Sequence, residues 1–226
     1  MSDEPEDSQP PLIRRTWVYH AIMATVHTLS ILPFPTRIRG REHVPKSGGA
    51  LIVCNHASFF DIPLVSKAAG PRHVCFVARK SLANNRIMAF IMDRCGAVLI
   101  DPKAGDRKAL ARVVEHLEAG DLVAMFAEGT RSRDGRLLPF KRGALLAARQ
   151  ARVPVVPCAV IGTHHAFGRN HRLPRPARCE VRLGPALDAR GANALDEVRA
   201  WIALQLEGTD QADPGPGEAP GEPDPA

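Results

Sequence analysis

The chain has 226 residues, of which 45% are hydrophobic and 24% are charged. This composition excludes a disordered or collagen-like protein and predicts one sizeable domain with a buried core. Residues 11–206 hold all 30 Lys and Arg but only 14 of the 24 acidic residues, so this part carries +16 and should attract phosphate-bearing ligands, anionic membrane or nucleic acid.

The five cysteines are scattered, odd in number and without a C-x-x-C pair. Three of them lie inside apolar runs, where thiols serve as small hydrophobic side chains. This pattern predicts a reduced cytosolic setting and no metal site.

Residues 1–10 are acidic and rich in proline, so we expect them to be disordered and not to form a signal peptide. Residues 16–36 contain no charged side chain over 21 positions, which meets the length of a spanning helix, yet they include two histidines and two prolines. With Arg14, Arg15 and Trp17 in front, residues 11–36 are predicted to form a membrane-associated helical segment in the interface. A single span and a core helix of a soluble domain are the alternatives.

From residue 37 onward, short apolar runs alternate with helical patterns. The strands predicted from the apolar runs are Ala50–Cys54, His73–Ala78, Ala97–Ile100, Leu122–Phe126 and Val153–Ile161. Helices are predicted from Asp106 to Gly120 and from Asn193 to Leu206. The alternation predicts an α/β domain over residues 37–207 with a mostly parallel central sheet flanked by helices, followed by a disordered acidic Pro/Gly-rich tail over residues 208–226.

His56 and Asp61 stand five positions apart in NHASFFD, directly after the first predicted strand. In a continuous helix they would be rotated by about 140° and would not share a face, but a strand-to-helix turn lets them meet. There Asp61 could fix the imidazole tautomer, so that His56 takes a proton from a substrate hydroxyl. In the alternative interpretation, which the spacing alone favours, Asp61 only caps the following helix and His56 satisfies the strand end.

The second candidate site is Glu128-Gly129-Thr130-Arg131, which follows another buried strand. Backbone N–H groups beside Arg131 make a suitable anion cradle. The alternative is a solvated surface loop. Glu128 argues against it, because a carboxylate directly after an apolar strand is costly to desolvate unless it is paired.

Together, these motifs make the chain resemble the glycerolipid acyltransferase family, in particular its bacterial 1-acyl-glycerol-3-phosphate (lysophosphatidate) acyltransferases. The resemblance covers roughly residues 37–165 in motif order. The residues that carry it are Asn55–Asp61, Gly96–Asp101, Phe126–Ser132, Phe140–Gly143 and Val153–Pro157.

The resemblance implies that His56 is the general base and that Asp61 orients it. The acceptor hydroxyl would attack the thioester of acyl-CoA or acyl-carrier protein directly, without a covalent acyl-enzyme and without a cofactor. It also implies that Glu128, Gly129, Thr130 and Arg131 bind the lysolipid acceptor, and that Lys141 helps to shape its site. Ser58 is read as structural, because the chain has no G-x-S-x-G elbow.

The chain departs from the family's second block, which usually ends Ile-Asp-Arg, because Pro102 follows Asp101. Lys103 or Arg107 could supply the missing charge, and Lys103 would do so as a point charge. Alternatively, the acceptor is another lysolipid, such as a lyso-aminolipid or a lysophospholipid. A second departure is Ala127, where proline is common in the family.

The remaining motifs are less specific. His164-His165 has no carboxylate at a ligand spacing and is interpreted as a polar loop. Six basic residues follow between 169 and 182 with only Phe167 as an aromatic neighbour, so the expected partners are anionic headgroups or a carrier protein and not nucleic acid. We expect an enzyme at the cytoplasmic face of the membrane. The rival from another class is a non-catalytic basic module that binds membrane or nucleic acid.

Overall fold

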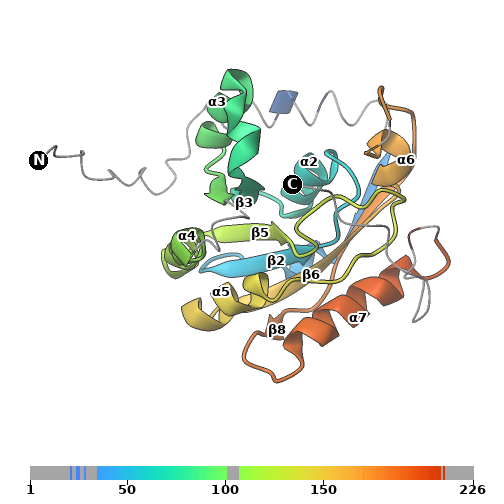
Figure 1. The fold of residues 1–226 in the computed structure, drawn as a ribbon. Helices are drawn as coiled ribbons and strands as arrows, with labels where there is room; N and C mark the ends of the chain where they lie inside the picture. Colours follow the sequence, from blue (N-terminus) through green and yellow to red (C-terminus); the bar gives the residue numbers. More distant parts are fainter. Residues whose placement is uncertain are drawn as a thin grey trace, which may run out of the picture.

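The computed structural model describes residues 35–100, 107–169, 171–209 and 211, with four isolated positions at 21, 24, 25 and 28. Its centre is an eight-stranded sheet with helices on both faces (Figure 1). The strands are β1 (Thr36–Arg39), β2 (Ala50–Cys54), β3 (Val74–Arg79), β4 (Val98–Ile100), β5 (Leu122–Phe126), β6 (Pro154–Ile161), β7 (Cys179–Leu183) and β8 (Leu187–Asp188). The helices are α2 (Asp61–Ala68), α3 (Arg86–Arg94), α4 (Arg107–Glu118), α5 (Gly143–Ala151), α6 (Thr163–Phe167) and α7 (Ala194–Leu206), with short 3-10 turns η1 (Arg41–His43) and η2 (Lys80–Asn84).

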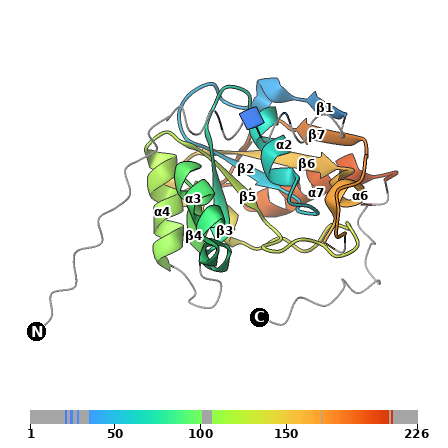
Figure 2. The same ribbon diagram turned by 90° about the horizontal axis from the view of Figure 1, so that it is seen from above.

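The strand order is β1-β7-β6-β2-β5-β3-β4, and β8 pairs with the start of β6 (Figure 2). All described pairings are parallel except those of β6 with β7 and with β8. All five residues of β2 are buried, because β2 is flanked by β5 and β6 and both of its faces are covered. This is why its sequence is continuously apolar.

Two hydrophobic clusters lie on opposite faces of the sheet. On one face, Val113, Val114 and Leu117 of α4 pack with the buried residues of α5 and α7. On the other face, Leu64 and Val65 of α2 pack against the strands. Figure 1 shows α2 on one side of the sheet and α5 and α7 on the other. The helices thus enclose the central strands and leave the strand ends available for polar residues.

The predicted α/β class with a mostly parallel sheet is confirmed, and the five predicted strands agree with β2 to β6 within one residue at either end. The two predicted helices correspond to α4 and α7, although Asp106, which was expected to cap α4, lies outside the described residues. The strands β1, β7 and β8 and the helices α3, α5 and α6 were not predicted. The antiparallel strands β7 and β8 make the sheet mixed.

The predicted membrane-associated segment 11–36 and the predicted disordered residues 1–10 lie almost wholly outside the described residues. In the part of the chain that the structure describes, no helix has both the length and the apolar character needed to cross a membrane. At the other end, the predicted tail was expected to be disordered from residue 208. The structure corrects this boundary, because Gln211 is fully buried; residues 212–226 lie outside the described residues.

Candidate active site

The ends of β2 and β5 bring the two predicted motifs to the same edge of the sheet. Cys54 and Phe126, the last residues of these parallel strands, are register partners. The N–H of Ala127 donates to the carbonyl of Cys54 (3.2 Å), which continues the pairing by one step. His56 and Glu128 therefore emerge side by side at the carboxyl edge, where ligands bind in parallel α/β sheets.

His56 and Asp61 meet in the turn between β2 and α2. Nδ1 of His56 lies 2.8 Å from Oδ2 of Asp61, and the Asp61 side chain is fully buried. The same oxygen accepts the N–H groups of Ala57 and Ser58, each at 2.8 Å. The imidazole ring of His56 stacks on the ring of Phe126, with 3.9 Å between the two ring centroids. The aspartate is thus held by the backbone N–H groups of the turn before α2, and it sets the orientation of the ring.

Asn55 holds the residue before this histidine. Its amide donates to the carbonyl of Val160 (2.9 Å) and accepts the N–H of Val160 (2.8 Å). The side chain therefore imitates one more backbone pair between β2 and β6. Asn55 had no predicted role, although a buried amide directly after a central strand is the kind of residue that needs two such partners.

Glu128, which was expected to bind the acceptor, contacts the backbone of the turn that carries His56. The side chain is only 3% exposed, and Oε1 accepts the backbone N–H of His56 at 3.0 Å. Burial raises the pKa of Glu128 well above its usual value, and the N–H of His56 opposes this shift. Oε1 of Glu128 thus supports the backbone of His56, and the predicted contact of Glu128 with the acceptor stays a prediction.

The loop of residues 129–142, hereafter the 129–142 loop, carries Gly129, Thr130, Arg131 and Lys141. Gly129 has a φ of +70°, and a Cβ atom there would lie 2.9 Å from Nζ of Lys141. The backbone conformation favours a glycine, and the lysine side chain lies across this position. Nη2 of Arg79, at the end of β3, donates to the carbonyl of Gly129 (2.9 Å). Thr130 is half-buried.

Arg131 projects from the 129–142 loop toward the turn that carries His56. Its guanidinium carbon lies 3.8 Å from the centre of the Phe59 ring. The next residue, Ser132, donates its N–H to the carbonyl of His56 at 2.9 Å. The predicted base and the predicted anion-binding arginine are thus parts of one arrangement.

The middle of the 129–142 loop is held by a residue of the C-terminal segment. Oε1 of Gln211 accepts the N–H of Gly162 (2.6 Å), and its Nε2 donates to the carbonyl of Gly135 (3.3 Å). Near the end of the loop, the N–H of Lys141 donates to Ala127 (2.8 Å). Gln211 was missed because nothing in the local sequence separates it from the acidic tail.

The comparisons with known proteins agree with this arrangement. A family model described as Acyltransferase matches residues 35–161, which run from the start of β1 to the end of β6. The chain belongs to the acyltransferase family.

Several curated proteins of this family are similar to the chain. A sheep 1-acyl-sn-glycerol-3-phosphate acyltransferase alpha is 31% identical over 174 residues, which cover 76% of this chain and 60% of the relative. A chloroplastic 1-acyl-sn-glycerol-3-phosphate acyltransferase from Brassica napus is 36% identical over 151 residues, or 64% of this chain and 43% of the relative. The chain therefore matches between about two fifths and three fifths of the length of these relatives.

A crystal structure of the 1-acyl-sn-glycerophosphate acyltransferase from Thermotoga maritima has the same fold. The TM-score is 0.68 at 24% sequence identity, over 83% of this chain and 78% of that chain. At this identity the likeness concerns the fold. It agrees with the mixed α/β sheet described above.

Two further predictions about individual residues differ in outcome. Ser58 is fully buried, and its hydroxyl donates to the carbonyl of Phe167 (2.8 Å) and accepts the N–H of Phe60 (3.1 Å), as expected of a structural residue. Lys103 lies outside the described residues, as do Asp101 and Pro102, so its predicted part in phosphate binding stays a prediction.

Potential metal ligands occur at the opposite edge of the sheet. Cys75, His116 and Asp121 bring ligand atoms within 4.8 Å of one another among the described residues. Cys75 lies near the start of β3, and Asp121 precedes β5, so the group is far along the strands from His56. It takes no part in the candidate active site.

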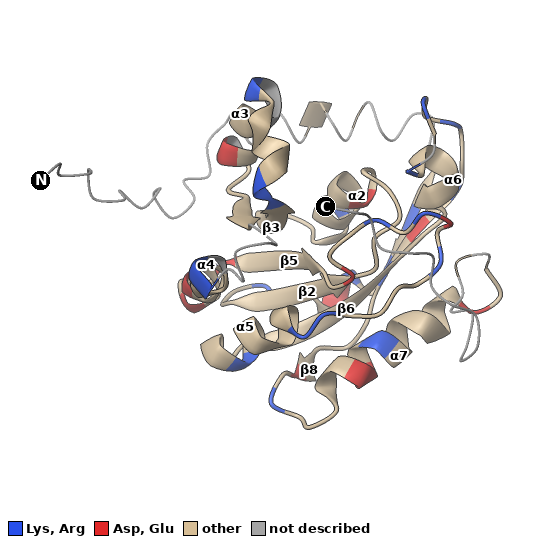
Figure 3. Ribbon diagram, in the orientation of Figure 1, with Lys and Arg blue, Asp and Glu red and all other residues tan. Residues whose placement is uncertain are grey.

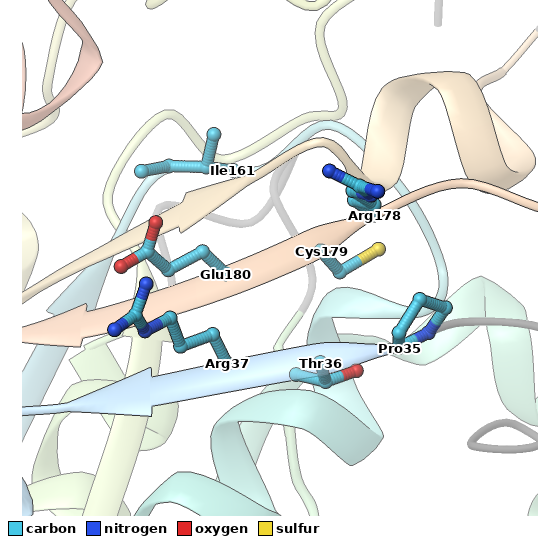
Figure 4. A pocket seen from close by; sticks show the side chains of 7 residues that line it. All are labelled: Pro35, Thr36, Arg37, Ile161, Arg178, Cys179 and Glu180. Carbon is cyan, nitrogen blue, oxygen red and sulfur yellow. The ribbon is translucent and has the colours of Figure 1, made fainter.

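A surface pocket of about 470 Å³ also lies outside the candidate active site. Its walls are formed by Pro35, Thr36, Arg37, Ile161, Arg178, Cys179 and Glu180 (Figure 4). Glu180 pairs with Arg182 (3.0 Å) and Arg39 (2.7 Å), and the hydrogen bond from Arg182 lowers its pKa. The Glu180 carboxylate in this pocket thus already forms ion pairs with two arginine side chains.

Proposed function

We propose that the protein transfers an acyl chain from acyl-CoA or acyl-carrier protein to the free hydroxyl of 1-acyl-glycerol-3-phosphate and so forms phosphatidate. The observation that carries this proposal is the hydrogen bond of His56 to the buried Asp61, next to Arg131 on the neighbouring loop. Membership of the acyltransferase family and the printed names of the similar proteins support the choice of reaction and acceptor.

In the proposed mechanism, His56 acts as the general base. Nδ1 is occupied by Asp61, so Nε2 receives the proton of the acceptor hydroxyl. The hydroxyl oxygen forms a bond to the thioester carbonyl carbon, and the carbon–sulfur bond breaks as the tetrahedral intermediate collapses. The imidazolium of His56 then returns the proton to the departing thiolate, and Asp61 stabilises the imidazolium while it exists.

The acceptor is proposed to bind against the 129–142 loop. Arg131 offers a guanidinium fork for the phosphate. Because Gly129 has no side chain, the acceptor can approach the backbone of Gly129 and Thr130 closely. Glu128 acts through the backbone of His56. Lys141 lies across Gly129 and helps to shape the same surface.

We also propose that this reaction takes place at the cytoplasmic face of the membrane. The +16 charge of residues 11–206 supports attraction to anionic lipid headgroups. Figure 3 shows Lys and Arg residues along the loop after β5 and along the chain beyond α6, on the side of the molecule that carries α2 and α6.

The test is acyl transfer by the purified protein in mixed micelles, with labelled acyl-CoA or acyl-carrier protein and lysolipids that differ in headgroup. We expect phosphatidate from lysophosphatidate, and a loss of about 10²- to 10⁴-fold in kcat for His56→Ala. Binding to liposomes should be unchanged in this variant. Product from another lysolipid only would move the acceptor to the neighbouring class, and full activity of His56→Ala would contradict the assignment of the base.

A further inference from the structure

The chain after α6 is fixed against the turn that carries His56. Ser58 and Gly168 form an isolated antiparallel bridge, and the hydroxyl of Ser58 donates to Phe167 at 2.8 Å. A Cβ atom on Gly168 would lie 2.6 Å from the carbonyl oxygen of His164, so only a glycine fits there. Beyond the bridge, the N–H of His171 donates to Gly168 (3.0 Å). Arg169, between these contacts, is therefore held by a fixed backbone.

The bridge also places the backbone of Arg169 close to the turn that carries His56. Arg169 directly follows Gly168, which pairs with Ser58 in that turn. Arg131 reaches the same turn from the 129–142 loop and covers Phe59. Two arginines from distant parts of the sequence thus meet the short turn that contains the base.

The two guanidinium groups influence each other. Burial lowers the pKa of Arg131, and the charge of Arg169 lowers it further, while Asp61 acts in the opposite direction. Both arginines are half-buried, so water screens their mutual repulsion less than at an open surface. Asp61 already pairs with His56. An arrangement of this kind is stabilised when an anion with two charges binds beside both groups.

We propose that Arg169 binds the phosphate group of the acceptor together with Arg131, and so selects a phosphate monoester over other headgroups. This inference rests on the proposed function. It assigns to Arg169 the task for which the sequence suggested Lys103 and Arg107 as candidates. A monoester is a dianion near neutral pH and accepts two guanidinium forks, whereas a diester has one charge.

The experiment measures KM and kcat for lysophosphatidate in mixed micelles of constant surface charge, with the full chain as wild type, Arg169→Ala, Arg169→Lys and Arg172→Ala. We expect Arg169→Ala to raise KM by roughly 10-fold or more and to change kcat by less than about 3-fold, because a charged hydrogen bond to bound substrate is lost. Arg169→Lys should recover part of the loss. Arg172 is exposed on the same chain segment, so its replacement reports the effect of one positive charge on micelle binding and should raise KM far less.

Three results would overturn the inference. A KM for Arg169→Ala equal to the wild-type value would show that this guanidinium does not contact the phosphate. Equal increases in Arg169→Ala and Arg172→Ala would assign the effect to surface charge. If Arg169→Ala fails to fold, Arg169→Lys and Arg169→Gln give the same comparison. Absence of phosphatidate with the wild-type protein would instead contradict the proposed function itself, and the inference with it.

Discussion

The chain contains two histidine–aspartate pairs with the same spacing, and they lie at opposite edges of the sheet. His56 and Asp61 are five positions apart with Nδ1 and Oδ2 at 2.8 Å, and His116 and Asp121 are five positions apart with the corresponding atoms at 2.9 Å. The sequence spacing and the hydrogen-bond distance are nearly identical in the two pairs. Any difference in what the two pairs do must therefore come from their surroundings.

The surroundings differ in burial, in backbone support and in neighbouring charge. The Asp61 side chain is fully buried and accepts two backbone N–H groups, whereas the Asp121 side chain is 31% exposed. His116 belongs to the last turn of α4 and lies at the amino edge of the strands. His56 lies at the carboxyl edge beside Arg131. The carboxyl edge of the sheet and the neighbouring arginine therefore support the proposed catalytic role for His56 and Asp61 and not for His116 and Asp121.

The largest expected difference between the two pairs is in the effect of removing the carboxylate charge. Asp61→Asn should lower kcat by about 10²- to 10⁴-fold, because the amide no longer stabilises the imidazolium or fixes the productive tautomer. Asp121→Asn should change kcat by less than about 2-fold, because its histidine is remote from the reaction. Both variants are assayed with lysophosphatidate at saturating acyl donor. Similar losses in the two variants would mean that the pairs act through stability and not through chemistry.

A smaller effect is expected from Glu128, which supports only the catalytic pair. Glu128→Gln keeps an oxygen that can accept the N–H of His56 and should keep kcat within about 3-fold of wild type. Glu128→Ala leaves that buried N–H without its acceptor and should lower kcat by roughly 10- to 100-fold. If Glu128→Gln lost as much activity as Glu128→Ala, the negative charge itself would be required, as for a residue that contacts the acceptor.

The raised pKa of Glu128 adds a dependence of stability on pH. Between the pKa of the unfolded chain and the higher pKa of the folded protein, the folded state keeps a proton that the unfolded state has released. The free energy of unfolding therefore falls as pH rises through this window. Glu128→Gln removes this decrease, so its stability relative to wild type should increase with pH above about 4.5. Urea unfolding at several pH values measures the difference, and a constant difference would contradict the buried carboxyl.

The sequence predicted those parts of the molecule that depend on residues close together in the chain. The continuous apolar runs predicted strands β2 to β6, and the spacing of His56 and Asp61 after β2 predicted that they meet in a strand-to-helix turn. Strand β7 was missed because Glu180 and Arg182 alternate with its buried residues inside an arginine-rich stretch. The short pairing of β8 with β6 has only two residues and leaves little pattern.

The supports of the site could not be predicted for a different reason. Asn55 reaches Val160, and Arg79 reaches Gly129. These contacts join residues that are 50 or more positions apart, and their partners are backbone groups, which have no sequence signature. A single sequence states which residues need partners, but the tertiary fold determines which partners they obtain.

The smallest expected effect concerns Gln211. Its side chain holds the 129–142 loop, which lies beside His56 and Asp61 and not beside His116 and Asp121. In Gln211→Glu, the ionised carboxylate can still accept the N–H of Gly162. It cannot donate a hydrogen bond to the carbonyl of Gly135, so that contact becomes repulsive. Protonation restores the donor, and burial raises the pKa of such a carboxyl group. We expect KM for lysophosphatidate to be about 3- to 10-fold above wild type at pH 8 and closer to wild type near pH 5.5.

The ratio of the KM of the variant to that of the wild type at each pH cancels every pH effect that both proteins share. Gln211→Met fills a similar volume without any hydrogen bond, so its ratio should be independent of pH. If the ratio for Gln211→Glu were equally constant, the contact with Gly135 would not control the 129–142 loop. A ratio that falls toward one in acid would show that a single buried amide from the C-terminal segment sets the position of the loop, because the two proteins differ only at residue 211.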